Sequence, residues 1–572
     1  MRFLFKKIYI IIFLLNIFLL DTNVFAKNSE IKYSQQDISN YFQGIISASK
    51  YQNNDAFKYL NKVKSLKSRH YKYNVEYIRT LVLLDKFDNA FSFSKNIWKK
   101  EDFFFEADLL LGLDFFIKKD YENAEKHFKR LNKISRYNYF FEGFIGNTLI
   151  AWSKASQQKE NNSFKFLEKV PKAYRHIVNT QKSFLKCYFN DPETFKAFDQ
   201  LIQNEDYNFE RYNFFLANYL LFNNEVSKAK EIIQESRKNN TSNLLLKQVE
   251  IFLKKSENKK IKNVFNCQNP RDPIAEFFYV IANLYSSEKE YKLSNFYLKI
   301  SLYLNNKFVP NRALLAENFY YQKKYINSKK NYFSIKNFGE VYSWYVAKSI
   351  SSILLETKGK KESVKNLEKE FNLLPDPSFE HYYELANFYK DNEYYENSIN
   401  FYSLALEKIK KNHPLTPKIL DRRGTSYERN GNWEEAEKDL KKSLEILPDQ
   451  PHVLNYLGYT WIDKGINLDE GLEMLKKANN LRENDGYIID SLGWAYYAKK
   501  NYKKAEYFLQ RAVELMPLDP IINDHYADTL WMLNKSIQAR YIWEHVLNLD
   551  QIEKKLKDNI NQKLIFGIKQ NL

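Results

Sequence analysis

A residue with little or no side chain recurs about every 34 positions along this 572-residue chain. Small residues at one place in successive helices let facing helix axes approach closely. A period in the thirties is typical of a solenoid, in which one helix-turn-helix unit is stacked on itself. The sequence therefore predicts an all-α chain of tandem helical hairpins. The series, in which Ile78 is the one large member, comprises Gly44, Ile78, Gly112, Gly146, Ala282, Ala316, Ser351, Ala386, Gly424, Gly458, Gly493 and Ala527.

Other positions of the repeat support this prediction. A second small residue follows twelve positions after the first in many units, as at Ala56, Ala124 and Ala505. Proline at 375, 448 and 517 falls near the end of its unit, where a residue without an N–H ends the second helix. The spacing therefore fits a unit of two helices in which proline ends the second helix.

This pattern resembles the tetratricopeptide repeat. The match is strongest from Gly424 to Val546, where "GTSYERNGNWEEAEKDLKKSLEILP" and "GWAYYAKKNYKKAEYFLQRAVELMP" carry the family's positions in tandem. The resemblance implies a right-handed α-solenoid of tandem repeats that binds other proteins and has no catalytic activity. The stretches 170–210 and 240–275 match poorly, so degenerate repeats and irregular helices both remain open there.

The chain divides into four predicted segments. Residues 1–26 form a signal peptide, because basic residues precede a short apolar run and Val24-Phe25-Ala26 resembles a signal-peptidase site. The 13-residue run from Ile8 to Leu20 is shorter than the roughly 20 residues of a membrane span. The polar stretch 254–273 is the predicted internal boundary. It separates an N-terminal, partly degenerate array from a C-terminal one, followed by a capping helix: 27–265, 270–550 and 551–572.

The two cysteines, Cys187 and Cys267, are 80 residues apart, which is more than two repeats. An exported protein could pair them. Because solenoid units contact mainly their neighbours, two free, half-buried thiols are the favoured interpretation, with pairing as the alternative. The eight histidines are scattered without a ligand spacing, so no metal or other cofactor is expected.

The net charge of +18 is unevenly distributed. Residues 416–550 carry 22 Asp and Glu against 18 Lys and Arg, so the positive excess lies mainly in the N-terminal array. A basic balance can indicate nucleic-acid binding, but export argues against that partner. Contact with an anionic envelope surface fits better.

The first helix of each hairpin is expected to line a concave groove. Its groove-facing positions in the C-terminal array are aromatic, acidic and amidic, which favours a peptide with basic or apolar side chains. A clamp for a C-terminal carboxylate is not expected, because Asp and Trp stand where lysine and asparagine would be needed. His452, Asp463 and Tyr487 fall at such positions as well. The predicted peptide-binding residues are Tyr383, Asn387, Lys390, Asn455, Tyr459, Asp490, Trp494, Tyr497, Asp524, Asp528 and Trp531.

No motif for catalysis occurs: the sequence has no phosphate-binding glycine loop, HExxH or GxSxG. The repeats also occupy nearly all of the chain, so we expect no enzyme.

The motifs N-Y-L-G-Y, D-S-L-G-W and N-D-H-x-x-D, at 455–459, 490–494 and 523–528, resemble one group of exported bacterial repeat proteins. That group includes an outer-membrane lipoprotein that serves as adaptor for a periplasmic carboxyl-terminal processing protease. The resemblance implies a periplasmic scaffold whose groove binds protein or peptide partners, an envelope protease or its substrate among them. This chain lacks the lipid-bearing cysteine. The alternative is a structural envelope-assembly factor, anchored by an uncleaved N-terminal helix and contacting anionic lipid or wall polymer.

Overall fold

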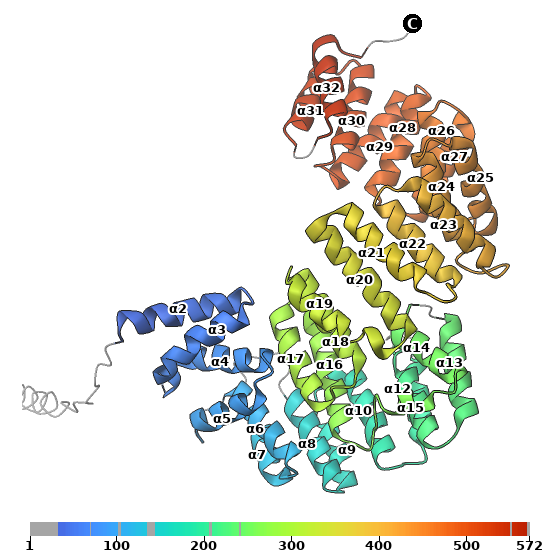
Figure 1. Cartoon of the computed structure of the whole chain (residues 1–572). Helices are drawn as coiled ribbons and strands as arrows, with labels where there is room; N and C mark the ends of the chain where they lie inside the picture. The colour runs from blue at the N-terminus through green and yellow to red at the C-terminus, as the bar shows by residue number, and fades with distance from the viewer. Residues whose placement is uncertain are drawn as a thin grey trace, which may run out of the picture. The chain divides into compact units, whose positions relative to one another are not determined.

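The computed structural model describes residues 33–68, 70–100, 104–133, 143–204, 209–239, 242–549 and 552–568. Over these residues the chain is a succession of α-helices, with three short 3₁₀ helices and no strand (Figure 1). The prediction of an all-α chain of tandem hairpins is confirmed. The predicted signal peptide lies outside the described residues.

The chain forms two compact units, Met1–Val346 (unit 1) and Ala347–Leu572 (unit 2). The predicted boundary at 254–273 differs from this division, because the helices that follow it pack onto the N-terminal helices. Unit 1 contains α2 Gln35–Ser49, α3 Asn53–Leu60, η1 Asn61–Ser68, α4 Tyr71–Leu83, α5 Phe87–Ile97, α6 Phe105–Ile117, α7 Tyr121–Leu131, α8 Phe144–Ser156, α9 Glu160–Glu168, η2 Lys172–Tyr174, α10 Arg175–Tyr188, α11 Thr194–Ile202, α12 Tyr212–Phe222, α13 Val226–Asn239, α14 Leu244–Lys254, α15 Asn258–Lys262, α16 Arg271–Ser287, α17 Tyr291–Leu304, α18 Val309–Tyr321, α19 Tyr325–Phe333 and η3 Lys336–Phe338.

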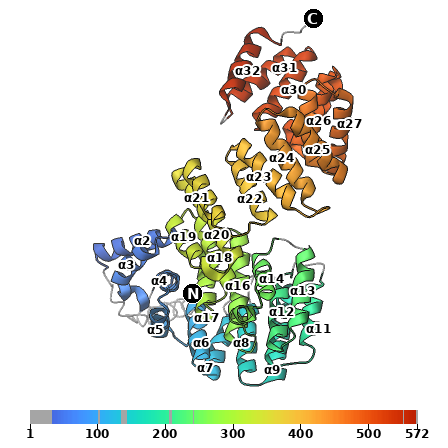
Figure 2. The ribbon, with the colours of Figure 1, turned by 45° about the vertical axis from the view of Figure 1, so that its right-hand side comes forward.

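Helix α20, Glu340–Lys358, crosses the boundary between the units. Unit 2 continues with α21 Lys360–Asn372, α22 Phe379–Asp391, α23 Tyr395–Lys408, α24 Thr416–Arg429, α25 Trp433–Ile446, α26 Pro451–Asp463, α27 Leu468–Leu481, α28 Gly486–Ala498, α29 Tyr502–Leu515, α30 Pro520–Met532, α31 Ser536–Leu547 and α32 Lys554–Phe566. Figure 2 shows the same succession of hairpins from a second direction.

The turn inside a hairpin follows one local rule. In the hairpin of α28 and α29, Lys500 has a positive φ of 58° and ends the first helix. The N–H of Lys500 donates to the carbonyl of Tyr497, and the N–H of Asn501 donates to that of Tyr496. This pair of bonds satisfies two carbonyls that the helix end leaves open. A left-handed residue closes the first helix of other hairpins in the same way, for example Asp85, Lys119, Lys289 and Lys323.

The recurring small residues sit where two helices touch. A Cβ added to Gly493 would lie 2.6 Å from Cγ of Leu509, in the partner helix of the same hairpin. At Gly112 the corresponding contact is with the ring of Phe128, at 2.3 Å. Since such distances are shorter than Cβ contacts in folded proteins, any larger residue at Gly493 or Gly112 would have to displace the side chain that packs against it. The position that defines the period is therefore the contact between the two helices of a hairpin.

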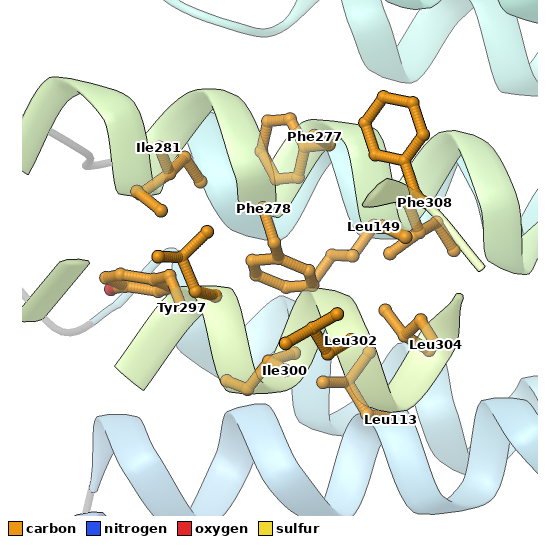
Figure 3. Packing of buried hydrophobic residues seen from close by; sticks show 14 of the residues in the cluster. Leu113, Leu149, Phe277, Phe278, Ile281, Tyr297, Ile300, Leu302, Leu304 and Phe308 are labelled. Carbon is orange, nitrogen blue, oxygen red and sulfur yellow. The ribbon is translucent and has the colours of Figure 1, made fainter. Parts of the chain in front are cut away.

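Unit 1 is more than a linear stack, because α16 and α17 pack against helices far earlier in the sequence. Phe278 of α16 and Leu302 of α17 share one hydrophobic cluster with Leu113 of α6 and Leu149 of α8 (Figure 3). The rings of Phe144 in α8 and Phe277 in α16 lie 5.1 Å apart. The inner side of this array is thus filled by the chain itself.

Charged and aromatic contacts also join α17 to the first hairpins. Lys292 and Glu76 form an ion pair at 2.6 Å across more than 200 residues of sequence. The ring of Phe87 stacks on Tyr303 with centroids 4.1 Å apart. These contacts join α17 to α4 and α5, near the start of unit 1.

A disulfide joins Cys187, near the end of α10, to Cys267, just before α16, with a Cα–Cα distance of 6.0 Å. The favoured prediction of two free thiols is therefore wrong. Its premise was that repeats contact mainly their neighbours. The chain instead returns to its earlier helices at α16, and this return brings residues 80 positions apart together.

Candidate peptide-binding groove

The predicted peptide-binding residues all lie on the first helices of successive hairpins in unit 2: α22, α26, α28 and α30. The structure gives each of them a definite environment, which differs strongly from one helix to the next. Their role as peptide contacts stays a prediction.

On α22, Asn387 has partners inside the protein. Its Oδ1 accepts from the hydroxyl of Tyr402 at 2.8 Å and from Nη1 of Arg422 at 2.6 Å. Burial raises the pKa of Tyr383, whose ring lies 5.8 Å from the guanidinium of Arg422. Lys390 is half-buried, 3.9 Å from Asp391.

On α26, Asn455 and Tyr459 are half-buried. The Oδ1 of Asn455 is buried and has no hydrogen-bond donor among the described residues. Burial raises the pKa of Tyr459 to about 12, and the nearby carboxylates of Asp463 and Asp490 add to the shift.

On α28, Asp490 is buried and bonds a histidine that the sequence prediction passed over. Nδ1 of His525 lies 3.0 and 3.1 Å from the two oxygens of Asp490. The ring of Trp494 stacks on the imidazole at 4.0 Å and on Tyr497 at 4.5 Å. Burial lowers the pKa of His525, but the carboxylates of Asp490, Asp524 and Asp528 together more than offset this, so the net shift is upward.

On α30, Asp524 and Asp528 are both occupied by a lysine of the last helix. Nζ of Lys563 in α32 lies 2.8 Å from the oxygens of both carboxylates. The indole N–H of Trp543 donates to Asp528 at 3.1 Å. Burial, and then repulsion from Asp524, raise the pKa of Asp528 to about 6 in spite of Lys563.

Trp531, also on α30, is covered by α31 and by Gly567. Its ring lies 5.5 Å from Trp543 and 5.4 Å from the guanidinium of Arg540. A Cβ on Gly567, just after α32, would meet the Trp531 indole at 2.0 Å. The α30 end of the predicted acidic and aromatic row is therefore filled by α32, inside the predicted capping segment.

The sequence analysis also missed Asp421 on α24. This half-buried carboxylate stands three residues before Gly424, as Asn455, Asp490 and Asp524 stand before the small residues of their own repeats. Burial raises its pKa, although His452, Arg422 and Lys390 lie close enough to lower it. Applying the repeat position to every unit would have found it.

Within the described residues, no group of three or more His, Cys, Asp or Glu side chains could hold a metal ion. None of the helices that the structure describes is long and apolar enough to cross a bilayer.

A family model described as tetratricopeptide repeat matches residues 417–450 and 488–519. Both segments lie in unit 2, the first over α24 and α25 and the second over α28 and α29. The chain is a tetratricopeptide repeat protein, and repeats of this kind serve protein–protein interaction.

Among curated proteins, a TPR repeat-containing protein of Pseudomonas aeruginosa is 28% identical over 167 residues, which cover 29% of this chain and 28% of that protein. A UDP-N-acetylglucosamine–peptide N-acetylglucosaminyltransferase of Giardia intestinalis is 31% identical over 147 residues, covering 25% of this chain and 9% of the relative. The chain thus matches well under half the length of these relatives.

Solved structures with similarity are repeat proteins as well. A tetratricopeptide repeat protein of Parabacteroides merdae is 18% identical, with a TM-score of 0.34, over 39% of this chain and 88% of that one. A chain of the APC/C hetero-tetramer Cut9-Hcn1 is 13% identical, with a TM-score of 0.35, over 93% and 97%.

Proposed function

We propose that the protein is an exported, non-enzymatic scaffold that binds protein or peptide partners through the face formed by α22, α24, α26 and α28 of unit 2. One contrast carries the proposal. In unit 1, α16 and α17 pack their apolar side chains against those of α6 and α8 (Figure 3). The α26 part of unit 2 keeps a buried carbonyl acceptor without a donor, on Asn455, beside half-buried Tyr459.

Export is part of the proposal. The disulfide between Cys187 and Cys267 supports an oxidising compartment, since such bonds are rare where thiols are kept reduced. The sequence pattern of residues 1–26 supports a cleaved signal peptide and a periplasmic location. N-terminal sequencing of protein recovered from the cell envelope should begin at Lys27. An intact Met1 in the washed membrane fraction would support the anchored alternative instead.

The finer proposal is that the scaffold is an adaptor that presents substrates to an envelope protease. It rests on the resemblance of residues 455–459, 490–494 and 523–528 to the exported adaptor group. The partner would then be the protease, its substrate, or both.

Site-specific crosslinking in the full-length protein tests these proposals. A photo-crosslinking amino acid replaces Tyr487, an exposed residue of α28 at a groove position, or Tyr507, an exposed residue of α29 in the same hairpin. We expect adducts with envelope proteins from position 487 and few from 507, and a protease or its substrate among those adducts. Equal adducts from both positions, or from 507 alone, would show that the groove is not the binding face. Adducts that never contain a protease or substrate would remove the adaptor role only.

A second candidate function is contact with the anionic lipid of the envelope through unit 1. A hollow of about 700 Å³ beside α10 and α11 is lined by several cations, among them Lys172, Arg175 and Lys182. Sedimentation with phosphatidylglycerol vesicles tests this candidate. Binding that Lys182→Glu abolishes would support it, and absence of binding at low salt would remove it.

A further inference from the structure

The last helices of unit 2 meet at a buried cluster of ionisable side chains. The cluster consists of Asp490 on α28, Asp524, His525 and Asp528 on α30, and Lys563 on α32. Nδ1 of His525 lies 3.0 Å from Asp490, and Nζ of Lys563 lies 2.8 Å from each of the other two carboxylates. The members on α28 and α30 are at most 8% exposed, and the Lys563 side chain is 13% exposed. These contacts join three helices through charge alone.

Other polar groups that face the cluster carry no charge near neutral pH. The indole N–H of Trp543 in α31 donates to Asp528 at 3.1 Å. Burial, and then nearby carboxylates, raise the pKa of Tyr497 in α28 and of Tyr459 in α26, so both phenols stay neutral. Among the described residues, the charge of the cluster is therefore set by three carboxylates, one lysine and one histidine.

Protons decide whether this cluster is balanced. Three ionised carboxylates outnumber Lys563 and a protonated His525 by one charge. A further proton on Asp528 balances the cluster, whereas loss of the proton from His525 leaves an excess of two negative charges. Because unbalanced charge is costly to bury, the packed state of these helices favours the protonated forms.

The pKa shifts of two members agree with this balance. Burial, and then repulsion from Asp524, raise the pKa of Asp528 from 3.8 to about 6. Burial lowers the pKa of His525, but the three carboxylates outweigh it and leave the pKa above the ordinary 6.5. A group that binds its proton more tightly when folded stabilises the fold at low pH, and this stability is lost as pH rises through the folded pKa. Both groups therefore destabilise this end as pH rises, Asp528 from about 4 to 6 and His525 above 6.5.

The cluster lies in the last hairpin of the stack, where a repeat can open without the rest. We propose that it is a proton-sensitive latch, which keeps α30, α31 and α32 docked on α28 in mildly acidic conditions and lets them open as pH rises past neutrality. Opening separates His525 from α28 and uncovers the ring of Trp494, which stacks on the imidazole at 4.0 Å. Since Trp494 is a predicted peptide contact, the latch changes the surface at this end of the binding face. That consequence rests on the proposed function, whereas the latch does not.

Hydrogen exchange of the full-length protein at about pH 5 and about pH 8 tests the latch. Protection factors, corrected for the intrinsic pH dependence of exchange, report the opening equilibrium of each helix. We expect the opening of α30 and α31 in wild type to increase at least about tenfold between the two conditions, which is the effect of one pKa unit. The internal control is the hairpin of α22 and α23, which carries no member of the cluster and should change less.

Two substitutions remove the titrating groups. Asp528→Asn keeps an oxygen for the Trp543 N–H and removes the charge, so protection of α30 and α31 at pH 8 should rise. His525→Gln cannot take up a proton, so protection at pH 5 should fall toward the wild-type value at pH 8. The double variant should respond to pH no more than α22 and α23 do. His545→Gln, at an exposed position of α31, is the matched control and should keep the wild-type response.

The wild-type comparison needs no variant, so it decides the question by itself if a substitution unfolds this end. Opening of α30 and α31 that changes with pH no more than that of α22 and α23 would overturn the latch. A double variant that folds and keeps the wild-type pH response would overturn it as well, since other groups would then be responsible. Neither result bears on whether unit 2 binds peptides, which the crosslinking from Tyr487 tests separately.

Discussion

Unit 1 and unit 2 are built from the same kind of hairpin, yet different contacts stabilise them. In unit 1, α17 packs on α4, and α16 packs on α8 and α10. An ion pair to α4 and a disulfide to α10 fasten this return of the chain. In unit 2 the extensive contacts join helices one or two apart in the sequence. The first unit is therefore expected to unfold as one body, and the second to behave as a stack of neighbouring repeats.

This difference also indicates which unit keeps a surface available for a ligand. Filling the inner side of unit 1 stabilises it and removes a surface that a ligand could use. In unit 2, α32 covers α30: its Lys563 pairs with Asp524, and Gly567, just after it, lies against Trp531. Its remaining first helices keep polar and aromatic side chains half-buried. Binding is accordingly proposed for the unit with fewer long-range contacts.

The largest expected effect comes from breaking a buried ion pair of unit 1. Glu276 in α16 is fully buried, and its Oε2 accepts from Nη1 of Arg211 at 2.8 Å. Glu276→Ala leaves the guanidinium without its counter-ion and should cost about 3–5 kcal/mol. Calorimetry should show the melting transition of unit 1 displaced to lower temperature.

The matched control is an exposed pair of unit 2. Glu393 and Lys360 form an ion pair with more than half of the Glu393 side chain exposed, so Glu393→Ala should change the stability little. Equal losses in the two variants would mean that unit 1 does not depend on its interior charges as described.

The next effect concerns the disulfide of unit 1. Replacing both Cys187 and Cys267 by alanine removes a link across 80 residues and should destabilise unit 1 by about 2–4 kcal/mol. Thermal unfolding monitored by hydrogen exchange would show the loss in unit 1, with unit 2 unchanged. Reduced wild type should melt like the double variant. A reductant without effect on wild type would contradict the bond's role.

These two regions also show what the sequence could predict. The 34-residue spacing identified the hairpins and the glycines at their contacts, because close approach of two helices needs a small residue wherever it occurs. The packing of α16 and α17 onto earlier helices could not be predicted from the sequence, since Phe277 and Leu302 stand in the same pattern as other buried helix residues. That packing is also why the disulfide was missed.

The candidate site, too, could be predicted only in part. The acidic and aromatic positions of α28 and α30 were found from their place in the repeat. Their occupants, His525 and Lys563, were not, because Lys563 lies outside the repeat period and His525 lies one residue beyond the predicted position. Asp421 was accessible to the same reasoning, since it shares its place with Asn455.

A smaller effect is expected from crowding one hairpin of unit 2. Gly493→Leu places atoms where Leu509 already lies, and overpacking of this kind costs about 1–3 kcal/mol. Gly424→Ala is the control, because its Cβ would meet its nearest atoms at 3.1 Å and alanine favours helix. We expect a lower melting temperature for the first variant and little change for the second. An unchanged melting temperature for Gly493→Leu would mean that the helix contact has been misplaced.

The smallest effect tests whether unit 2 responds locally. The carboxylate of Asp485 caps α28 by accepting from the N–H of Tyr487 at 3.1 Å and of Ile488 at 3.4 Å. Asp485→Ala should cost about 1 kcal/mol, as for loss of a helix N-cap. Because repeats in a stack depend mainly on their neighbours, faster amide exchange should appear in α28 and the adjoining helices and not in α22 or in unit 1. Asp519→Ala, which removes the equivalent cap of α30, should move the same response one repeat along. Exchange that rises evenly through unit 2 in both variants would show that it unfolds as one body, as unit 1 is expected to do.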